Sequence, residues 1–95
     1  MKLLWTNLAL NDLEAIGDYI RRDSSAEISA RLIKQIVTGV GSLTTFPHLG
    51  RAGRVPETRE LVVPNTSYLV PYRVKDNEVQ ILAVFHGARR WPETL

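Results

Sequence analysis

Arginines that stand close together beside glycines are the residues of this chain best suited to chemistry. The segment GRAGRVPETREL, residues 50–61, contains Arg51, Arg54 and Arg59. The planar guanidinium group of arginine binds phosphate and carboxylate groups through paired hydrogen bonds. Two interpretations of the segment are open: a turn whose arginines are solvated, or one wall of a site for a polyanion or for a partner's carboxylates.

His86, in the segment FHGARRWP, is the candidate for proton transfer. The unperturbed pKa of histidine lies near neutrality, so this side chain can serve as a general acid or base, although a lone histidine at a strand end also suits a purely structural role. The chain has no phosphate-binding loop of the GxxxxGK type, no zinc-ligand spacing and no recognisable set of Ser, His and Asp. We therefore predict no metal and no cofactor.

The basic residues are concentrated in the second half of the chain. The sequence has 12 basic and 10 acidic residues and a formal net charge of +2. Residues 1–48 contain five basic and five acidic side chains, so the whole excess follows residue 48. We predict that the arginines of this half, with a nearby tryptophan, form a rim that binds the target: Arg51, Arg54, Arg59, Arg73, Arg89, Arg90 and Trp91.

Length and composition indicate one globular domain that spans residues 1–95. The chain is 44% hydrophobic, and it has no cysteine, which suits a reducing compartment such as the cytoplasm. Asn7, Asn11 and Asp12 interrupt the apolar start of the chain and argue against a signal peptide. No segment approaches the roughly 18 apolar residues of a membrane span. We expect a cytoplasmic protein without membrane contact.

The hydrophobic spacing changes from a helical to a strand pattern along the chain. Leu13, Ile16 and Ile20 recur at intervals of three and four residues, as on one face of a helix. The expected elements are, in order, a strand at 2–6, a helix at 8–22, a second helix from 26 to 43, and strands at 58–64, 67–74 and 79–85. The predicted fold is α+β with the order β-α-α-β-β-β, in which a helical hairpin packs on one face of an antiparallel sheet.

The last strand is substantially apolar on both faces and the strand before it has one mixed face, although the two helices can cover only one face of the sheet. Strict alternation assigns Leu69, Pro71, Leu82 and Val84 to the face that the helices leave open. An exposed apolar patch of this kind usually marks an interface. The candidates to cover it are the C-terminal tail with Trp91 and a partner chain, and we expect this face to be exposed in the free chain and to bind a partner.

Three segments together resemble the RelE/ParE superfamily of toxins from bacterial type II toxin–antitoxin modules. They are ALNDLEAIGDYI, FPHLGRAGRVPETRELVVPNTSYLVPYRV and EVQILAVFHGARRWP, in this order and spacing. The resemblance covers nearly the whole chain. It implies a helical hairpin on an antiparallel sheet and a cognate antitoxin whose extended C-terminal segment wraps the toxin in a hetero-oligomer. Such a segment would cover the apolar face.

The superfamily uses two mechanisms. RelE-like members cut messenger RNA on the ribosome, whereas ParE-like members bind and poison DNA gyrase. Leu69 stands where the RelE-type pattern has a catalytic arginine, and the chain lacks the lysine pair and the C-terminal tyrosine of those nucleases. These departures favour a ParE-like toxin that acts on gyrase. A ribosome-dependent mRNA endonuclease stays open as the alternative, because Arg51, Arg54, Arg59 and His86 are residue types that related nucleases use.

Overall fold

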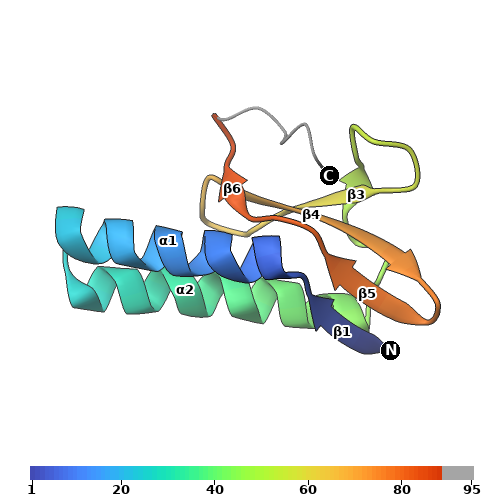
Figure 1. Cartoon of the computed structure of the whole chain (residues 1–95), viewed down its shortest axis with the longest axis horizontal. Helices are drawn as coiled ribbons and strands as arrows, with labels where there is room; N and C mark the ends of the chain where they lie inside the picture. Colours follow the sequence, from blue (N-terminus) through green and yellow to red (C-terminus); the bar gives the residue numbers. More distant parts are fainter. Residues whose placement is uncertain (89–95) are drawn as a thin grey trace.

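Two antiparallel helices lie against one face of a six-stranded sheet (Figure 1). The structure, a computed structural model, describes residues 1–88. Its elements are β1 (Lys2–Trp5), α1 (Asn7–Asp23), α2 (Ala26–Gly41), the 3-10 turn η1 (Ser42–Thr44), β2 (Arg51–Ala52), β3 (Arg59–Val62), β4 (Tyr68–Lys75), β5 (Glu78–Ile81) and β6 (Phe85–His86). The α+β class and the order of helices and strands predicted from the sequence are confirmed.

The sheet is mixed, with one parallel pair. Its strands lie in the order β1-β5-β4-β3-β2, and β6 pairs with the start of β4 beyond the end of β5. β1 runs parallel to β5, with Lys2 opposite Glu78 and Trp5 opposite Ile81, whereas the other strand pairs within residues 1–88 are antiparallel. A strand's hydrophobic pattern carries no information on its direction, so the parallel pair was not expected.

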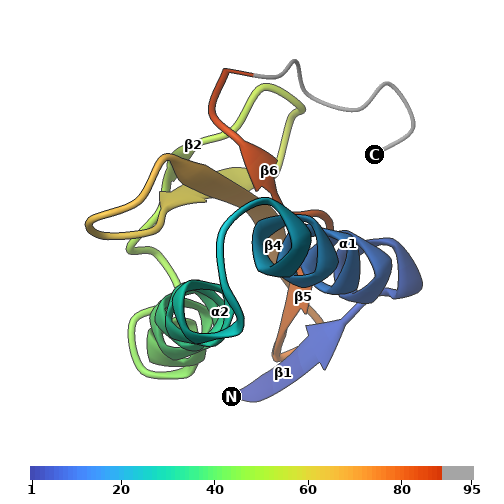
Figure 2. The same ribbon diagram turned by 90° about the vertical axis from the view of Figure 1, so that its left-hand side faces the viewer.

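Side-chain caps fix where both helices begin. Thr6 Oγ1 accepts a hydrogen bond from the Ala9 amide at 3.3 Å and donates one to the Ile81 carbonyl oxygen at 2.6 Å, which ties the start of α1 to the end of β5. Ser25 Oγ accepts from the Ile28 amide at 3.1 Å and caps α2. Such caps satisfy amides that have no partner within the helix. The two-residue link between the helices forces the antiparallel hairpin seen end-on in Figure 2.

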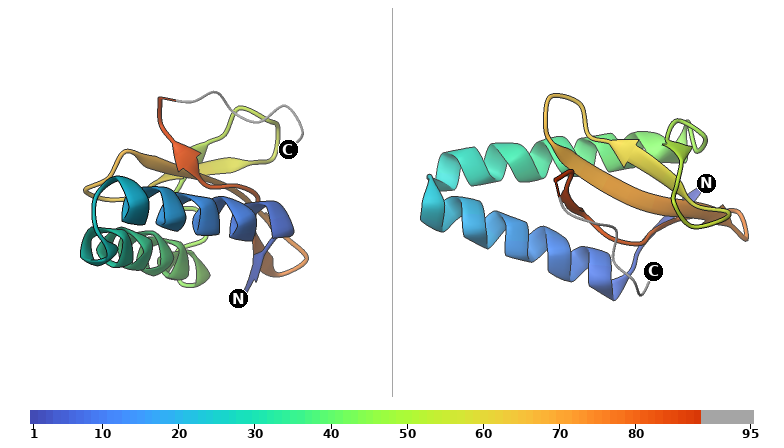
Figure 3. Two further views of the ribbon diagram at one scale, coloured as in Figure 1. Left: turned by 60° about the vertical axis from the view of Figure 1, so that its left-hand side comes forward. Right: turned by 90° about the horizontal axis from the view of Figure 1, so that it is seen from above.

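The main core fills the space between the hairpin and the sheet. It combines fully buried side chains of α2, such as Ile36 and Val40, with Tyr72 and Ile81 of the facing strands, all 0% exposed. Two further views show the hairpin on one side of the sheet and projecting past it at the α1–α2 turn (Figure 3). The opposite face of the sheet, turned away from the helices, is called the outer face below.

The strand expected at 79–85 is interrupted, and the interruption moves side chains to the other face. β5 ends at Ile81 and β6 begins at Phe85, and the residues between them belong to neither strand. Val84 packs in the main core, and its amide donates to Asp12 Oδ2 at 2.9 Å. Ala83 and Phe85 instead form a second cluster with Leu69.

The expectation that this face is exposed in the free chain is therefore wrong. Leu69, Pro71 and Val84 are buried by the chain itself, and only Leu82 of the predicted set is partly exposed. For Val84, strict alternation failed because it assumed one unbroken strand through residues 82–84. Leu69 lies on the predicted face but is buried with Ala83 and Phe85.

A tight turn joins the helices to β2 and β3. The Tyr72 hydroxyl donates to the Pro47 carbonyl oxygen and accepts from the Gly50 amide, both at 2.8 Å. Burial raises the pKa of this hydroxyl above its ordinary value. A Cβ atom at residue 50 would lie 2.6 Å from Tyr72 Cε1 and 3.0 Å from the Glu60 carbonyl carbon, so glycine is required there.

Substitution of this glycine should destabilise the chain. We expect Gly50→Ala to lower the free energy of unfolding by about 1–3 kcal/mol, because the added methyl must displace Tyr72 or the β3 backbone. The matched control is Gly41→Ala, where a Cβ meets nothing within 4 Å and alanine favours the helix. Urea unfolding followed by circular dichroism measures both. Equal stabilities of the two variants would contradict the steric argument.

The contact between Asp12 and the Val84 amide should stabilise the interruption after β5. We expect Asp12→Ala to lower the free energy of unfolding by about 1–2 kcal/mol, since it leaves a part-buried amide without its acceptor. Asn11→Ala, at the exposed neighbouring position, should change stability far less. Hydrogen exchange of the Val84 amide is the direct readout, and unchanged protection in Asp12→Ala would show that the contact is dispensable.

Candidate functional site

The outer face of the sheet carries a group of cationic side chains. Tyr72 and Ile81 are register partners that point into the core, so the neighbouring partners Arg73 and Gln80 point outward. The same alternation places Lys75 and Glu60 on this face, and Arg51 lies opposite Glu60. Three cations from β2 and β4 therefore share the surface that the helices do not cover.

Arg51 is held by a buried carboxylate. Its Nε and Nη2 donate to Glu60 Oε1 at 2.8 and 2.5 Å. The Glu60 side chain is only 5% exposed, whereas that of Arg51 is 65% exposed. A buried carboxylate needs such a partner, because water no longer solvates it. The pair fixes the guanidinium group at the surface in a defined orientation.

Arg73 and Lys75 border a cavity on this face. Arg73 Nε donates to Gln80 Oε1 at 2.6 Å, and Gln80 in turn donates to Glu78 Oε1 at 2.7 Å. The cavity of about 520 Å³ lies between these strands and the turn before β3. Its lining residues include Arg73, Lys75, Leu82 and Glu57. Cations beside a partly exposed leucine suit an anionic ligand that also has apolar groups.

Arg59 belongs to a different surface. It lies opposite Tyr72 on the helix-facing side of the sheet, and its Nη1 donates to the carbonyl oxygens of Gly50 and His48 at 2.9 and 3.3 Å. These bonds brace the turn at residue 50. Arg59 thus stabilises the turn, whereas Arg51 and the exposed Arg54 reach solvent. Binding of a polyanion or of a partner's carboxylates by these arginines stays a prediction.

The other members of the predicted rim are Arg89, Arg90 and Trp91, and they lie outside the described residues. No metal-binding group of three or more His, Cys, Asp or Glu side chains occurs within residues 1–88. None of the helices in the same range is long and apolar enough to cross a membrane.

His86 lies in a groove beside α1, away from these cations. Its ring meets that of Tyr68 edge to face, with centroids 5.5 Å apart and an interplanar angle of 79°. His86 Nδ1 accepts a hydrogen bond from the Ala88 amide at 3.1 Å. The groove, of about 450 Å³, is also lined by Asp12 and Tyr19. Because Tyr68 packs against the main core, the side chain of His86 opposite it faces the helices and not the outer face.

Some residues that were not predicted from the sequence also line the cationic outer face and the groove at His86. Lys75 follows Arg73 by two residues, and this spacing within one strand was the available signal for a shared face. Tyr68 and Tyr19 come from β4 and α1, so only the packing of the helix on the sheet brings them to His86. Burial, with a smaller contribution from Tyr19, raises the pKa of Tyr68.

Comparison with known proteins is consistent across sequence and structure. Residues 3–91 match the family described as ParE toxin of type II toxin–antitoxin system, parDE. The chain is 40% identical to Y4kP of Sinorhizobium fredii, which is named as a candidate toxin, over 99% of this chain and 96% of that protein. It is 35% identical to toxin RelE2 of Caulobacter vibrioides, over 93% of this chain and 97% of that protein.

Solved structures share the fold. A chain of the chromosomal ParDE toxin–antitoxin system of P. aeruginosa superimposes with a TM-score of 0.83 at 33% identity, with 90% of this chain and 95% of that chain covered. A chain of the RelBE2 toxin–antitoxin complex of Mycobacterium tuberculosis superimposes with a TM-score of 0.65 at 23% identity and the same coverage, a likeness of fold alone. The family match over nearly the whole chain and the relatives above 30% identity agree, and this chain belongs to the ParE toxin family of type II toxin–antitoxin systems.

Proposed function

We propose that this toxin acts by binding DNA gyrase through the outer face of its sheet, without cleaving RNA, and that a cognate antitoxin neutralises it by covering that face. The proposal concerns the target and the binding residues. It goes beyond family membership, because one fold in this superfamily serves both a gyrase poison and a nuclease.

The observation that carries the proposal is the separation of the proton-transfer candidate from the cations. Cleavage of RNA by its own 2′-hydroxyl requires groups that move protons and groups that stabilise the charged phosphorane, all around one phosphate. His86 faces α1, whereas Arg51 and Arg73 lie on the outer face, with the sheet between them. One phosphate cannot contact both sets.

The surroundings of Leu69 support the same conclusion. This position, where the RelE-type pattern has an arginine, is 8% exposed and packs with Ala83 and Phe85. A charged side chain there would have to leave this cluster. The outer face is thus apolar at one end and cationic at the other, which suits a protein surface with carboxylates.

The proposed antitoxin-binding surface lies on the same outer face. Of the four residues predicted to bind antitoxin, Leu82 lines the cavity together with Arg73 and Lys75. We propose that an extended acidic segment of the antitoxin places carboxylates on these two cations and an apolar side chain on Leu82. Leu69 and Pro71 lie buried on the same face, whereas Val84 packs in the main core on the other side of the sheet.

A ribosome-dependent mRNA endonuclease is the second candidate. The observation in its favour is the group of Arg51, Arg73 and Lys75 on one exposed face, because closely spaced cations also suit an RNA backbone. In this case another group of the outer face, and not His86, would have to move protons.

Removal of one outer-face cation should separate the alternatives. We expect Arg73→Ala to weaken inhibition of gyrase supercoiling by about tenfold, since arginine is enriched among the interface residues whose truncation costs about 1 kcal/mol or more. His86→Ala should inhibit like the unmodified toxin. Arg22→Ala, at the exposed end of α1, is the matched control for loss of an arginine.

Primer extension on translating messenger RNA provides the complementary measurement. The unmodified toxin should leave ribosome-bound messenger intact. Cuts in register with codons would overturn the proposal, whether or not they disappear in His86→Ala, and so would gyrase inhibition that is equally strong in Arg73→Ala and in the Arg22→Ala control.

A further inference from the structure

Two arginines of the outer face are each held by a side chain of the neighbouring strand. Arg51 Nε donates to Glu60 Oε1 at 2.8 Å, and Arg73 Nε donates to Gln80 Oε1 at 2.6 Å. In both cases the residues are register partners, Arg51 on β2 with Glu60 on β3 and Arg73 on β4 with Gln80 on β5. The same cross-strand contact thus occurs twice on this face.

A guanidinium group that is held through Nε keeps an edge for a ligand. Its terminal nitrogens, Nη1 and Nη2, can bind a carboxylate end-on. Within residues 1–88 Arg73 uses Nε alone, and Arg51 uses Nε and Nη2 for a single oxygen of Glu60. The Arg51 side chain is 65% exposed, and Arg73 is exposed as well. Both terminal edges therefore remain accessible to an anion.

The two acceptors are themselves fixed. The Glu60 side chain is only 5% exposed, so its carboxylate is held in the packed part of the outer face. Gln80 is half-buried, and its Nε2 donates to Glu78 Oε1 at 2.7 Å, which directs the amide oxygen toward Arg73. A side chain that is already ordered loses less conformational entropy when it binds a partner.

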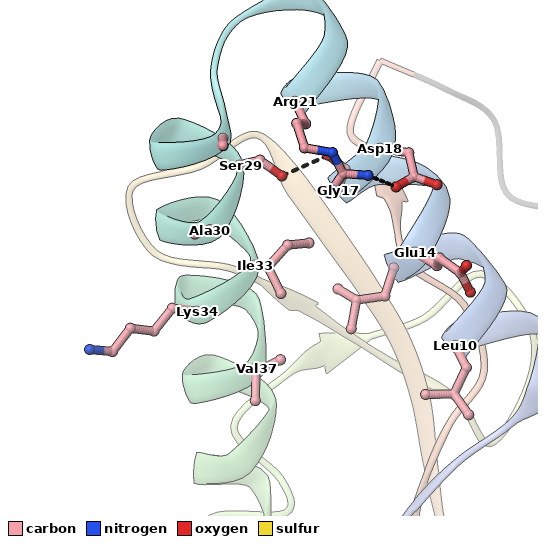
Figure 4. A pocket seen from close by; sticks show the side chains of 12 residues that line it. Leu10, Glu14, Gly17, Asp18, Arg21, Ser29, Ala30, Ile33, Lys34 and Val37 are labelled. Carbon is pink, nitrogen blue, oxygen red and sulfur yellow. Dashed lines mark hydrogen bonds and ion pairs between the residues drawn. The ribbon is translucent and has the colours of Figure 1, made fainter.

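Arg21, on the side of the hairpin turned away from the sheet, shows a contrasting arrangement. Its Nη2 donates to Asp18 Oδ1, three residues earlier on the same helix (Figure 4). This contact uses a terminal nitrogen, and the two side chains are 56% and 43% exposed. A solvated pair of this kind holds its guanidinium group only weakly. The cross-strand bonds of Arg51 and Arg73 therefore differ from an ordinary surface ion pair.

From this arrangement we propose that Glu60 and Gln80 are positioning residues, which orient Arg51 and Arg73 so that each binds one carboxylate of the target protein. The inference rests on the proposed function, in which the outer face binds the target. It adds the orienting role of two residues that contact the target only through the arginines, and it specifies how far apart the two carboxylates must lie.

The register gives this spacing. Arg51, Glu60 and Pro71 lie level on three adjacent strands, and Arg73 follows Pro71 by two residues. Strands lie about 4.8 Å apart and rise about 3.4 Å per residue, so the Cα atoms of the two arginines lie about 12 Å apart. Residues four apart in an extended chain are separated by about 13 Å and share one face. Carboxylates at such positions match the two arginines, whereas adjacent carboxylates do not.

The acidic side chains near Arg73 leave its charge available. Glu78 bonds to Gln80 and lies level with Lys75, and Glu57 lines the same cavity as Arg73. Neither carboxylate forms an ion pair with Arg73 in the part of the chain that the structure describes. A carboxylate of the partner can therefore form the direct pair.

A double-mutant cycle on inhibition of gyrase supercoiling tests the orienting role. Gln80→Met keeps the length of the side chain but lacks the amide oxygen, so it should weaken inhibition by about three- to tenfold, because Arg73 must then become ordered on binding. In the Arg73→Ala background the same substitution should have no further effect. A merely structural role would weaken inhibition equally in both backgrounds. Gln35→Met, on α2, is the matched control.

A second measurement does not depend on gyrase. Two seven-residue peptides of identical composition serve as probes, one with glutamates four residues apart and one with adjacent glutamates. Shifts of the arginine Nε–H signals in NMR spectra of the full chain report binding. The first peptide should bind at least about threefold more tightly, because both of its carboxylates can be bound at once. Gln80→Met should remove this difference.

The two measurements separate this inference from the choice of target. Equal binding of the two peptides, or an equal effect of Gln80→Met with and without Arg73, would overturn the positioning role. If the peptides differ as expected but the unmodified toxin does not inhibit gyrase, the positioning role is supported and only the proposed target is wrong. A single-stranded RNA that binds more tightly than the first peptide, and loses affinity in Gln80→Met, would overturn the assignment to protein carboxylates.

Discussion

The buried hydroxyl of Tyr72 is the contact on which the connection between helices and sheet depends. Its ring is fully buried in the main core, while its oxygen bonds to the backbone at Pro47 and Gly50, after the second helix. One side chain thus sets the distance between the core of the sheet and the turn that follows the helices. A buried polar group costs free energy unless it is paired, so both bonds are required together. The position of β2, and with it that of Arg51, follows from this turn.

The interruption between β5 and β6 has a comparable effect on the other side of β4. An unbroken strand through Val84 would direct this residue to the outer face and Phe85 to the core. The three residues outside both strands reverse this assignment, and the Asp12 carboxylate satisfies the amide that the interruption leaves without a strand partner. As a result the helix-facing groove receives His86, and the outer face receives the cluster of Leu69, Ala83 and Phe85. The separation of the His86 imidazole from the guanidinium groups of the outer face is thus a consequence of the three residues between β5 and β6.

The sequence was sufficient to predict the features that depend on local periodicity. The spacing of Leu13, Ile16 and Ile20, the capping serine before α2 and the change to a strand pattern led to the correct elements and order. Features that depend on long-range contacts were not predictable. The parallel pairing of β1 with β5 leaves no trace in the pattern of either strand. At the interruption the Val84 amide bonds to Asp12, which is 72 residues away in the sequence.

The arginines illustrate the same limit at the level of the site. Arg51, Arg54 and Arg59 look equivalent in the sequence, because residue type and spacing do not show what each guanidinium group contacts. Arg59 donates to backbone carbonyl oxygens and Arg51 to a buried carboxylate, so the first supports the turn while the second also remains at the surface.

This division of roles separates three surfaces of a very small domain. The exposed side of the hairpin, the groove at His86 and the cationic outer face are formed by different residues, and the core lies between the first and the last. A ligand on the outer face therefore leaves the hairpin side accessible. Coupling between the two surfaces would have to pass through packed residues such as Tyr72 and Val40, which have no free space in which to change position. We therefore expect binding at the two surfaces to be energetically independent.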